Sequence, residues 1–368
     1  MKAGKKETNN REEWGFSLIE SLIALGITLI VLAGIFEVYK HSTDMTIAAT
    51  RTSELSLNIQ TALDMMRRDF EKTDNVFIEK DGIPLKNNVP TNVWGNANRW
   101  CNPPDCTSIA SAQADAILLP ASTSGTGRSS LPTGTSFVFD AVTPIMVNNR
   151  NGVSILFADS FARNITVTVS VQSGNVQATV NADADANTRE MFGAIRRNDL
   201  ILLENVGGRV LQRVTNVIPA NGAIAPIIRF GGNDTTGLNQ NFTVSTPTVS
   251  SVTLMRRVTY YLQDWPDEVD ASGQPVTWLM RQVNVKPAVQ IIPGADINLT
   301  YDIANTEGSG IAASDVANPT QIQSRDIRMV NVTITNTDFT NSTLGEHPLS
   351  NTIQTKMAVR RYTGRFEF

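Results

Sequence analysis

The sequence of residues 14–40 is WGFSLIESLIALGITLIVLAGIFEVYK, a mostly apolar run with a carboxylate, Glu20, near its beginning. The part from Phe16 to Phe36 has about 21 residues, which in a helix span roughly 31 Å, the thickness of the hydrocarbon core of a bilayer. Lysine and arginine are concentrated before the run, and this bias keeps the leader in the cytoplasm and exports the chain that follows. We therefore expect a membrane-spanning helix over residues 16–39, preceded by a cytoplasmic leader over residues 1–15.

Three explanations compete for the carboxylate inside this run. A cleaved secretory signal has a shorter apolar region that ends at an A-x-A-like site, and only a weak match exists at residues 31–33. A plain membrane anchor fits the length but leaves Glu20 unexplained, because a charge costs about 2–3 kcal/mol at the centre of such a helix and less near an end. The third explanation is a functional carboxylate that pairs with a cation.

The motif GFSLIE, followed by the long apolar run, resembles the class III signal of type IV prepilins and pseudopilins. The resemblance implies that a prepilin peptidase cuts between Gly15 and Phe16 and methylates the new N-terminus. Glu20 would then be the fifth residue of the mature protein. Its carboxylate could neutralise the ammonium group of Phe16 in a neighbouring subunit, which makes two otherwise costly charges tolerable in a medium of low dielectric constant.

The periodicity after the membrane segment predicts that the helix continues to about Lys72, with residues 40–72 forming an amphipathic half. Apolar or small residues recur at three- and four-residue spacing along one stripe, at Met45, Ala48, Thr52, Leu55, Ile59, Ala62, Leu63, Met66 and Phe70. We expect this stripe to pack on a globular domain, and a coiled coil with a partner is the alternative. The end of the segment, LDMMRRDFEKT, also resembles the corresponding helix end of PilW-like minor pilins and J-type pseudopilins.

The exported body, residues 73–368, is predicted to be a large antiparallel β domain, so that the whole chain belongs to the α+β class. Residues 73–135 are rich in turn-forming residues, and short runs with β-branched residues and period-two alternation follow them. The predicted strands are SFVFD, GVSILFA, NITVTVSVQ, VQATV, DLILLEN, RVLQRVTNV, APIIRF, SSVTLMRRVTYYL, VTWLMRQVNV, ADINLTYDI, DIRMVNVTIT and TKMAVRRYT. The body is predicted to be one domain or two lobes divided near residues 245–250. Residues 199–217 and the strands from Arg256 to Ile303 also resemble the PilW family.

The two cysteines of the chain, Cys101 and Cys106, lie in the motif CNPPDC, where the prolines force a turn. They would form a small disulfide loop in an oxidising compartment and would be free thiols in the cytosol. Because the N-terminal segment indicates export of the body, we expect the disulfide.

Motifs for catalysis or metal binding are not found in the sequence. His41 and His347, the two histidines, neighbour no nucleophile or metal motif. Asp183, Asp185 and Asn187 alternate as in calcium loops, but the glycine and the glutamate that such loops require are missing, which favours a solvated acidic loop. We expect no enzyme, no cofactor and no metal site. The net charge of −4 gives no reason to expect nucleic acid as a partner.

The resemblance implies a PilW-like minor pilin that waits in the inner membrane and then primes assembly of a type IV pilus or lies at its tip. Its partners would be other minor pilins, the major pilin, the prepilin peptidase and the inner-membrane assembly platform. A J-type minor pseudopilin of a type II secretion system, in a periplasmic pseudopilus, is the structural alternative. An adhesin or DNA-binding module displayed on the pilus is an alternative of another class.

Overall fold

The computed structural model describes residues 17–75, 83–84, 138–139, 142–147, 150–172, 175–181, 183–197, 199–205, 208–220, 226–230, 247–270, 273–284, 287–304, 311–317, 327–338 and 349–359. The chain divides into two compact units, Met1–Ser53 and Glu54–Phe368. The boundary between them falls inside the long helix α1 (Leu18–Glu71), whose two halves are therefore described separately.

Helix α1 has 54 residues and ends in a short 3-10 helix, η1 (Lys72–Asn75). No proline interrupts it, and residues with high helix propensity dominate its sequence. The hydroxyl group of each threonine in this helix donates a hydrogen bond to the backbone carbonyl four residues earlier. This is so for Thr28, Thr43, Thr46, Thr50, Thr52 and Thr61.

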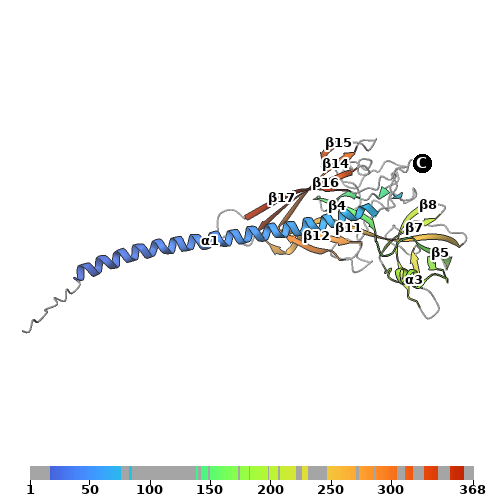
Figure 1. Cartoon of the computed structure of the whole chain (residues 1–368), viewed down its shortest axis with the longest axis horizontal. Coiled ribbons are helices and arrows are strands. Elements are labelled where there is room, and N and C mark those ends of the chain that lie inside the picture. The colour runs from blue at the N-terminus through green and yellow to red at the C-terminus, as the bar shows by residue number, and fades with distance from the viewer. Residues whose placement is uncertain are drawn as a thin grey trace, which may run out of the picture. The chain divides into compact units, whose positions relative to one another are not determined.

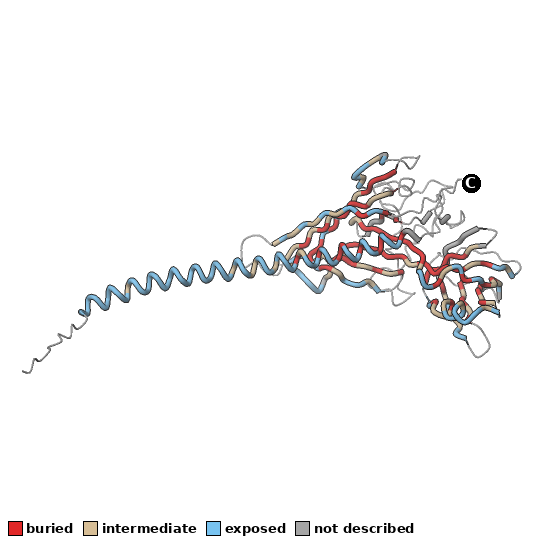
Figure 2. The backbone as a smooth tube through the Cα atoms, viewed as in Figure 1, coloured by how far each residue is buried: buried red, intermediate tan, exposed pale blue. Residues whose placement is uncertain are grey.

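The two halves of α1 differ in burial (Figure 2). The first half is exposed over nearly its whole surface, whereas the second half buries one stripe, formed by Leu55, Ile59, Ala62, Leu63, Met66, Asp69 and Phe70. The spacing of these residues is that of a single helix face. From Leu55 onwards the stripe packs on the β-rich body of the same chain, as the amphipathic pattern predicts, whereas Met45, which the prediction includes in the stripe, is 61% exposed.

Antiparallel strands make up most of the body (Figure 1). In chain order they are β1 (Ile83–Pro84), β2 (Val138–Phe139), β3 (Val142–Val147), β4 (Arg150–Ala158), β5 (Ile165–Gln172), β6 (Asn175–Val180), β7 (Leu200–Asn205), β8 (Gly208–Arg213), β9 (Asn216–Ile218), β10 (Ile227–Phe230), β11 (Thr248–Val269), β12 (Pro275–Val283), β13 (Val289–Pro293), β14 (Ala295–Ala304), β15 (Ile311–Val316), β16 (Ile327–Asp338) and β17 (Leu349–Ala358). A short helix, α3 (Ala186–Gly193), lies between β6 and β7.

The described strands form three sheets. An 11-stranded sheet has the order β13-β12-β11-β5-β6-β10-β9, and β3, β4, β7 and β8 join it off this path through β11 and β4. A 4-stranded sheet has the order β15-β14-β16-β17, and β1 pairs with β2. The large sheet is organised around β11, which has 22 residues. The first part of β11 pairs with β5 and β7, and its later part pairs with β4 and β12.

Two hydrophobic cores lie within the body. The first core joins the buried stripe of α1 to strands of both larger sheets, with Ile59, Met66, Phe70, Leu299 and Val332 among its members. The second core joins β5, β6, β7, β10 and α3. β11 contributes to both, because Val252 and Leu254 belong to the second core while Val258, Tyr260 and Leu262 belong to the first.

The structure confirms the predicted combination of one long apolar N-terminal helix and a large antiparallel β domain. The run ITVTVSV is β5, with Ile165, Val167 and Val169 buried and Thr166 exposed, although Val171 is 48% exposed near the end of the strand. Strands β1, β3, β13 and β15 were not predicted. The last strand begins at Leu349, ahead of the predicted start at Thr355.

The predicted division into two lobes near residues 245–250 stays a prediction. The structure places residues 54–368 in one compact unit, and β11 connects its two cores across residues 248–269. The turn-rich region 73–135 lies for the most part outside the described residues.

Candidate functional site

The first half of α1 presents an apolar surface. Its large hydrophobic side chains, from Leu18 to Tyr39, are between 44% and 80% exposed. In the part of the chain that the structure describes, α1 alone is long and apolar enough to cross a membrane, by length and composition. A continuous exposed apolar surface of this kind is typical of a segment that contacts lipid or other apolar helices.

Glu20 lies in the first turn of α1, at the end of this apolar surface. The backbone N–H of Ser17 donates to its Oε2 at 3.4 Å, and the N–H of Ile19 donates to Oγ of Ser17 at 3.2 Å. Both contacts use backbone donors that a helix N-terminus leaves without an intrahelical acceptor. No basic side chain among the described residues forms an ion pair with Glu20, so a cationic partner for this carboxylate would have to come from elsewhere.

Several predicted site residues lie outside the described residues. These are the processing residues Gly15 and Phe16, the cysteines Cys101 and Cys106, and His347. His41 is described, and it lies exposed on α1.

The segment that resembled a calcium loop begins the helix α3. Asp185 is its N-cap, and Oδ1 of Asp185 accepts a hydrogen bond from the backbone N–H of Thr188 at 2.5 Å. This bond and the one from the Thr188 side chain lower the pKa of Asp185. The expectation of a solvated acidic loop was therefore wrong from Ala186 onwards, where the chain is helical. Within the described ranges, no three His, Cys, Asp or Glu side chains are grouped so that they could hold a metal ion.

A buried carboxylate, Asp69, lies in the last turn of α1 and has three side-chain partners. Tyr260 Oη donates to Asp69 Oδ2 at 2.7 Å, and Arg281 donates to the same oxygen from Nε at 2.9 Å and from Nη2 at 2.8 Å. Lys72 Nζ lies 3.1 Å from Asp69 Oδ1. We call these four residues the Asp69 cluster. The side chain of Asp69 is only 3% exposed, so the cluster links the end of the helix to β11 and β12 through a desolvated charge.

The pKa values in the Asp69 cluster follow from this arrangement. Burial raises the pKa of Tyr260, and the charge of Asp69 and its hydrogen bond raise it further. Burial disfavours the charged form of Arg281, but the charge of Asp69 and the hydrogen bonds that Arg281 donates to Asp69 and to Tyr260 Oη outweigh it, so the pKa of Arg281 lies above its usual value. Arg281 is therefore a permanent cation here, and Tyr260 stays a neutral donor.

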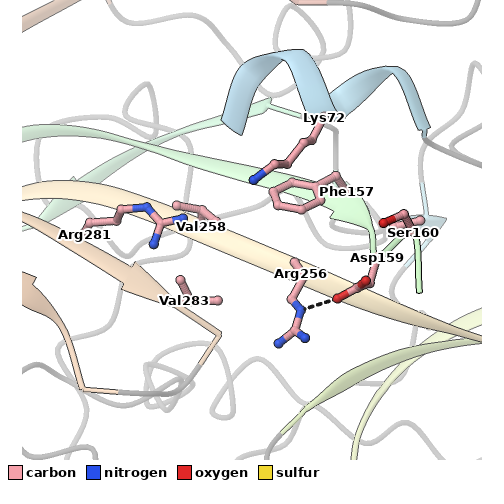
Figure 3. Close-up of a pocket in the computed structure, with 9 residues that line it drawn as sticks. Lys72, Phe157, Asp159, Ser160, Arg256, Val258, Arg281 and Val283 are labelled. Carbon is pink, nitrogen blue, oxygen red and sulfur yellow. Dashed lines mark hydrogen bonds and ion pairs between the residues drawn. The ribbon is translucent and has the colours of Figure 1, made fainter. Parts of the chain in front are cut away.

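A hollow of about 340 Å³ lies beside the cluster (Figure 3). Three basic side chains line it together with one carboxylate, one hydroxyl and four small or apolar side chains: Lys72, Arg256, Arg281, Asp159, Ser160, Phe157, Ala158, Val258 and Val283. We call it the basic hollow. Side chains that alternate along a strand project to the same face, so Arg256 and Val258 of β11 share a face. The register places Arg256 opposite Phe157 and Val258 opposite Val283.

Two contacts organise the lining of the basic hollow. Arg256 Nε donates to Asp159 Oδ2 at 2.7 Å, the bond drawn in Figure 3. Burial works against the charged form of Asp159, but hydrogen bonds from the Phe161 N–H and from Arg256, with the charges of Arg256 and Arg163, lower its pKa overall. Lys72 Nζ lies 5.3 Å from the centre of the Phe157 ring, a cation–π distance.

Sequence reasoning did not find the Asp69 cluster or the basic hollow. One local signal was present, because Asp69 lies between Met66 and Phe70 on the buried stripe, where a carboxylate requires a partner. Two of its three partners, Tyr260 and Arg281, are 191 and 212 residues away along the chain, and no local pattern indicates them. Comparisons with family models, with curated proteins and with solved structures found no match to this chain.

Proposed function

We propose that the chain is a minor-pilin-like subunit of a type IV pilus, similar to the PilW family. Its N-terminal helix would hold it in the inner membrane with the body exported. After cleavage between Gly15 and Phe16 and methylation of Phe16, the apolar half of α1 would leave the bilayer and pack beside the helices of other subunits.

The observation that supports this proposal best is the arrangement of exposed and buried residues along α1. One uninterrupted helix has an exposed apolar half with a carboxylate at its start and a second half that belongs to the core of a β-rich body. A plain anchor explains the exposed half but not Glu20. An assembly in which Glu20 meets the ammonium group of a neighbouring Phe16 explains both, because the ion pair forms in an apolar surrounding where either charge alone is costly.

The size of the body favours a rare or terminal position over a repeated one. The predicted exported part, residues 73–368, is bulky for a subunit that repeats along a thin filament. It fits a subunit that primes assembly or lies at the tip.

Mass spectrometry of sheared surface pili tests the proposal directly. We expect a low-abundance tryptic peptide that begins at N-methylated Phe16 and ends at Lys40. The same peptide in the cell envelope alone would instead favour a pseudopilin of a secretion system. A chain that keeps its leader in every fraction would contradict the proposal.

A pair of variants isolates the role of Glu20. Glu20→Ala should leave cleavage intact but reduce the amount of the subunit in pili, because the Phe16 ammonium of its neighbour loses its partner. Glu37→Ala is the matched control, since Glu37 is another exposed carboxylate on the same apolar half. Equal incorporation of both variants would rule out the charge pair.

A further inference from the structure

We infer that the outer edge of β17 is a docking site for an extended segment of another protein, which would pair antiparallel with β17 and add a fifth strand to the 4-stranded sheet. β17 (Leu349–Ala358) lies at the border of this sheet, and β16 is its one strand neighbour in the part of the chain that the structure describes (Figure 1). The edge belongs to the body alone, so its capacity to pair does not depend on the proposed function.

The hydrogen bonds to β16 show which backbone groups of β17 face outwards. The backbone N–H of Val359 donates to the carbonyl of Arg328 at 2.8 Å, directly after the last pair of the ladder, Ala358 with Met329. In an antiparallel pair, residues that exchange hydrogen bonds with the partner strand alternate with residues that do not. The ten pairs between β16 and β17 run without a register shift, so the same alternation holds along the whole strand.

Five residues of β17 therefore direct both their N–H and their C=O away from β16. They are Ser350, Thr352, Gln354, Lys356 and Ala358, and all five are exposed. None of these backbone groups has a hydrogen-bond partner among the described residues. They form a row about 27 Å long with the spacing of a strand. A second backbone in extended conformation offers acceptors and donors with the same repeat.

The other edges of the two larger sheets are protected against such pairing. β9 has only three residues, and β3 and β13 contain the prolines Pro144 and Pro293. β8 carries Arg209 and Arg213 among its six residues, and the pairing of β15 shifts register beside Asp315, which has a positive φ of 55°. Short length, proline, charge and irregular register are the features by which proteins block an exposed edge.

β17 lacks these protecting features. It has ten residues without a proline, and its pairing with β16 contains no bulge. Its single charged residue, Lys356, lies near one end, with Nζ at 3.4 Å from Asp302 Oδ2 in the same sheet. An incoming strand would therefore meet a long, regular edge whose one charge already has a partner.

The inner face of β17 indicates which side chains the partner strand should carry. Met357 is 4% exposed in the first core, Ile353 is partly buried against that core, and Leu349 is also partly buried. Asn351 Nδ2 donates to Ser56 Oγ at 2.6 Å, so this face lies against the second half of α1. The first core thus continues to the edge of the sheet and is partly open there. A partner strand with an apolar side chain at every second position would close it.

The direction of α1 favours another protein over a second copy of this chain. Figure 1 shows β17 running along the second half of α1, so antiparallel pairing of two β17 strands would point these helix halves in opposite directions. Two copies that are both anchored in one membrane through α1 would not pair in this way. The choice of partner, unlike the pairing itself, rests on the proposed function.

Fluorescence anisotropy of a labelled synthetic peptide tests the edge on the full-length chain in a non-ionic detergent. The probe has the sequence of β16, residues 327–338, with both ends blocked. Its apolar residues Val330, Val332 and Ile334 share one face, as the partner strand requires. We expect saturable binding of this peptide to the wild-type chain.

N-methylation of the peptide distinguishes the two edges of β17. An antiparallel peptide on the outer edge, with its three apolar residues towards the core, points the N–H groups of the intervening residues Asn331, Thr333 and Thr335 at β17. Native β16 on the inner edge uses the N–H groups of the apolar residues instead. Methylation of the three intervening amides should therefore weaken binding at least about tenfold, because three hydrogen bonds are lost. Methylation of the three apolar residues' amides is the matched control and should leave the affinity unchanged.

A pair of variants of the chain provides the second test. Gln354→Pro removes one outward N–H, keeps the ladder to β16, and suits the extended conformation of the preceding residue. It should weaken binding of the unmodified peptide by about tenfold, since the proline ring also blocks the edge. Gln354→Ala removes only the side chain and should bind the peptide like the wild type. Far-ultraviolet circular dichroism confirms that both variants are folded.

Four results would overturn the inference. The first three are no binding of the unmodified peptide to the wild-type chain, equal binding of the two methylated peptides, and an unchanged affinity of folded Gln354→Pro. The fourth comes from sedimentation velocity of the full-length chain: a dimer that Gln354→Pro dissociates would assign the edge to a second copy. That last result would leave the prepilin-like processing of the N-terminus untouched, so it is distinct from a failure of the proposed function.

Discussion

The two halves of helix α1 have similar side chains and opposite surroundings. From Leu18 to Tyr39 its large apolar side chains are all exposed, whereas from Leu55 to Phe70 apolar side chains of the same kinds fill the first core. The difference lies in their distribution around the helix. The first half is apolar on every face, and the second half is apolar on one face, with charged residues such as Asp64, Arg67 and Arg68 on the others. A helix that is apolar all round needs an apolar solvent or other helices, while a one-sided stripe needs only a sheet.

A carboxylate lies near each end of α1, Glu20 in its first turn and Asp69 in its last, and the surroundings of these two carboxylates also differ. Among the described residues, Glu20 accepts a hydrogen bond from the backbone N–H of Ser17 alone, while Asp69 is buried among Tyr260, Arg281 and Lys72. The comparison teaches that one continuous helix can serve two environments. The predictions that follow test whether the two halves are energetically separate.

The largest expected effect comes from matched phenylalanine truncations. Phe70→Ala should lower the free energy of unfolding of the body by about 4 kcal/mol, because Phe70 is 1% exposed in the first core and the truncation leaves a cavity. Phe36→Ala, at a position 64% exposed, should leave it unchanged. Urea unfolding in detergent, followed by the fluorescence of Trp265 and Trp278, measures the free energy of unfolding of both variants. A comparable loss in the two variants would mean that the halves are not separate.

The carboxylates provide the next test. Asp69→Ala should destabilise the body by about 3 kcal/mol, because removing one partner of a buried ion pair leaves Arg281 and Tyr260 without their acceptor. Glu20→Ala should not change the stability of the body, since Glu20 contacts only its own helix turn. Urea unfolding measures the change in stability of both variants. A stability of Asp69→Ala equal to that of the wild type would show that the Asp69 cluster does not hold the helix end.

Acid should weaken the body through its paired carboxylates. The pKa values of Asp159 and Asp302 are lowered in the folded chain, so their contribution is complete above the unfolded value of about 3.9 and is lost as the pH falls through the folded values. The free energy of unfolding should therefore decrease below about pH 4. In Asp159→Asn the decrease should be shallower. A pH profile of Asp159→Asn parallel to that of the wild type would contradict the assignment.

The smallest effect is expected on the solvent side of the second half. Arg67→Gln removes the ion pair with Glu71, whose two side chains are 71% and 51% exposed. Exposed pairs of this spacing contribute about 0.5 kcal/mol or less, so the unfolding midpoint should hardly move. A loss as large as that of Asp69→Ala would show that this face of the helix is covered.

Much of the fold could be predicted because its signals are local. The long helix follows from its apolar run and three/four spacing, and β5 follows from the alternation in ITVTVSV. β15 was missed because IAASDV is short, lacks that alternation and contains Asp315 at a positive φ of 55°, where the register of its pairing shifts. α3 was missed because it has only eight residues, and its capping residue Asp185 resembled a calcium ligand.

The candidate sites differ in the same way: one is readable from local sequence and the others are not. The exposed apolar surface and Glu20 are visible in one continuous stretch of sequence. The Asp69 cluster and the basic hollow combine residues from the helix end, β4, β11 and β12, and their meeting depends on strand register, for example Tyr260 opposite Arg281. Register is fixed by long-range packing, so a single sequence does not reveal it.

The long strand β11 has a consequence for the cooperativity of the body. Its 22 residues take part in both hydrophobic cores, and its pairing partners change from β5 and β7 to β4 and β12 along its length. Neither core can open alone without breaking backbone hydrogen bonds of a strand that the other core holds in place. The amide hydrogens near Met255, where the two sets of partners meet, should thus exchange with solvent only through global unfolding, and the body should behave as one folding unit.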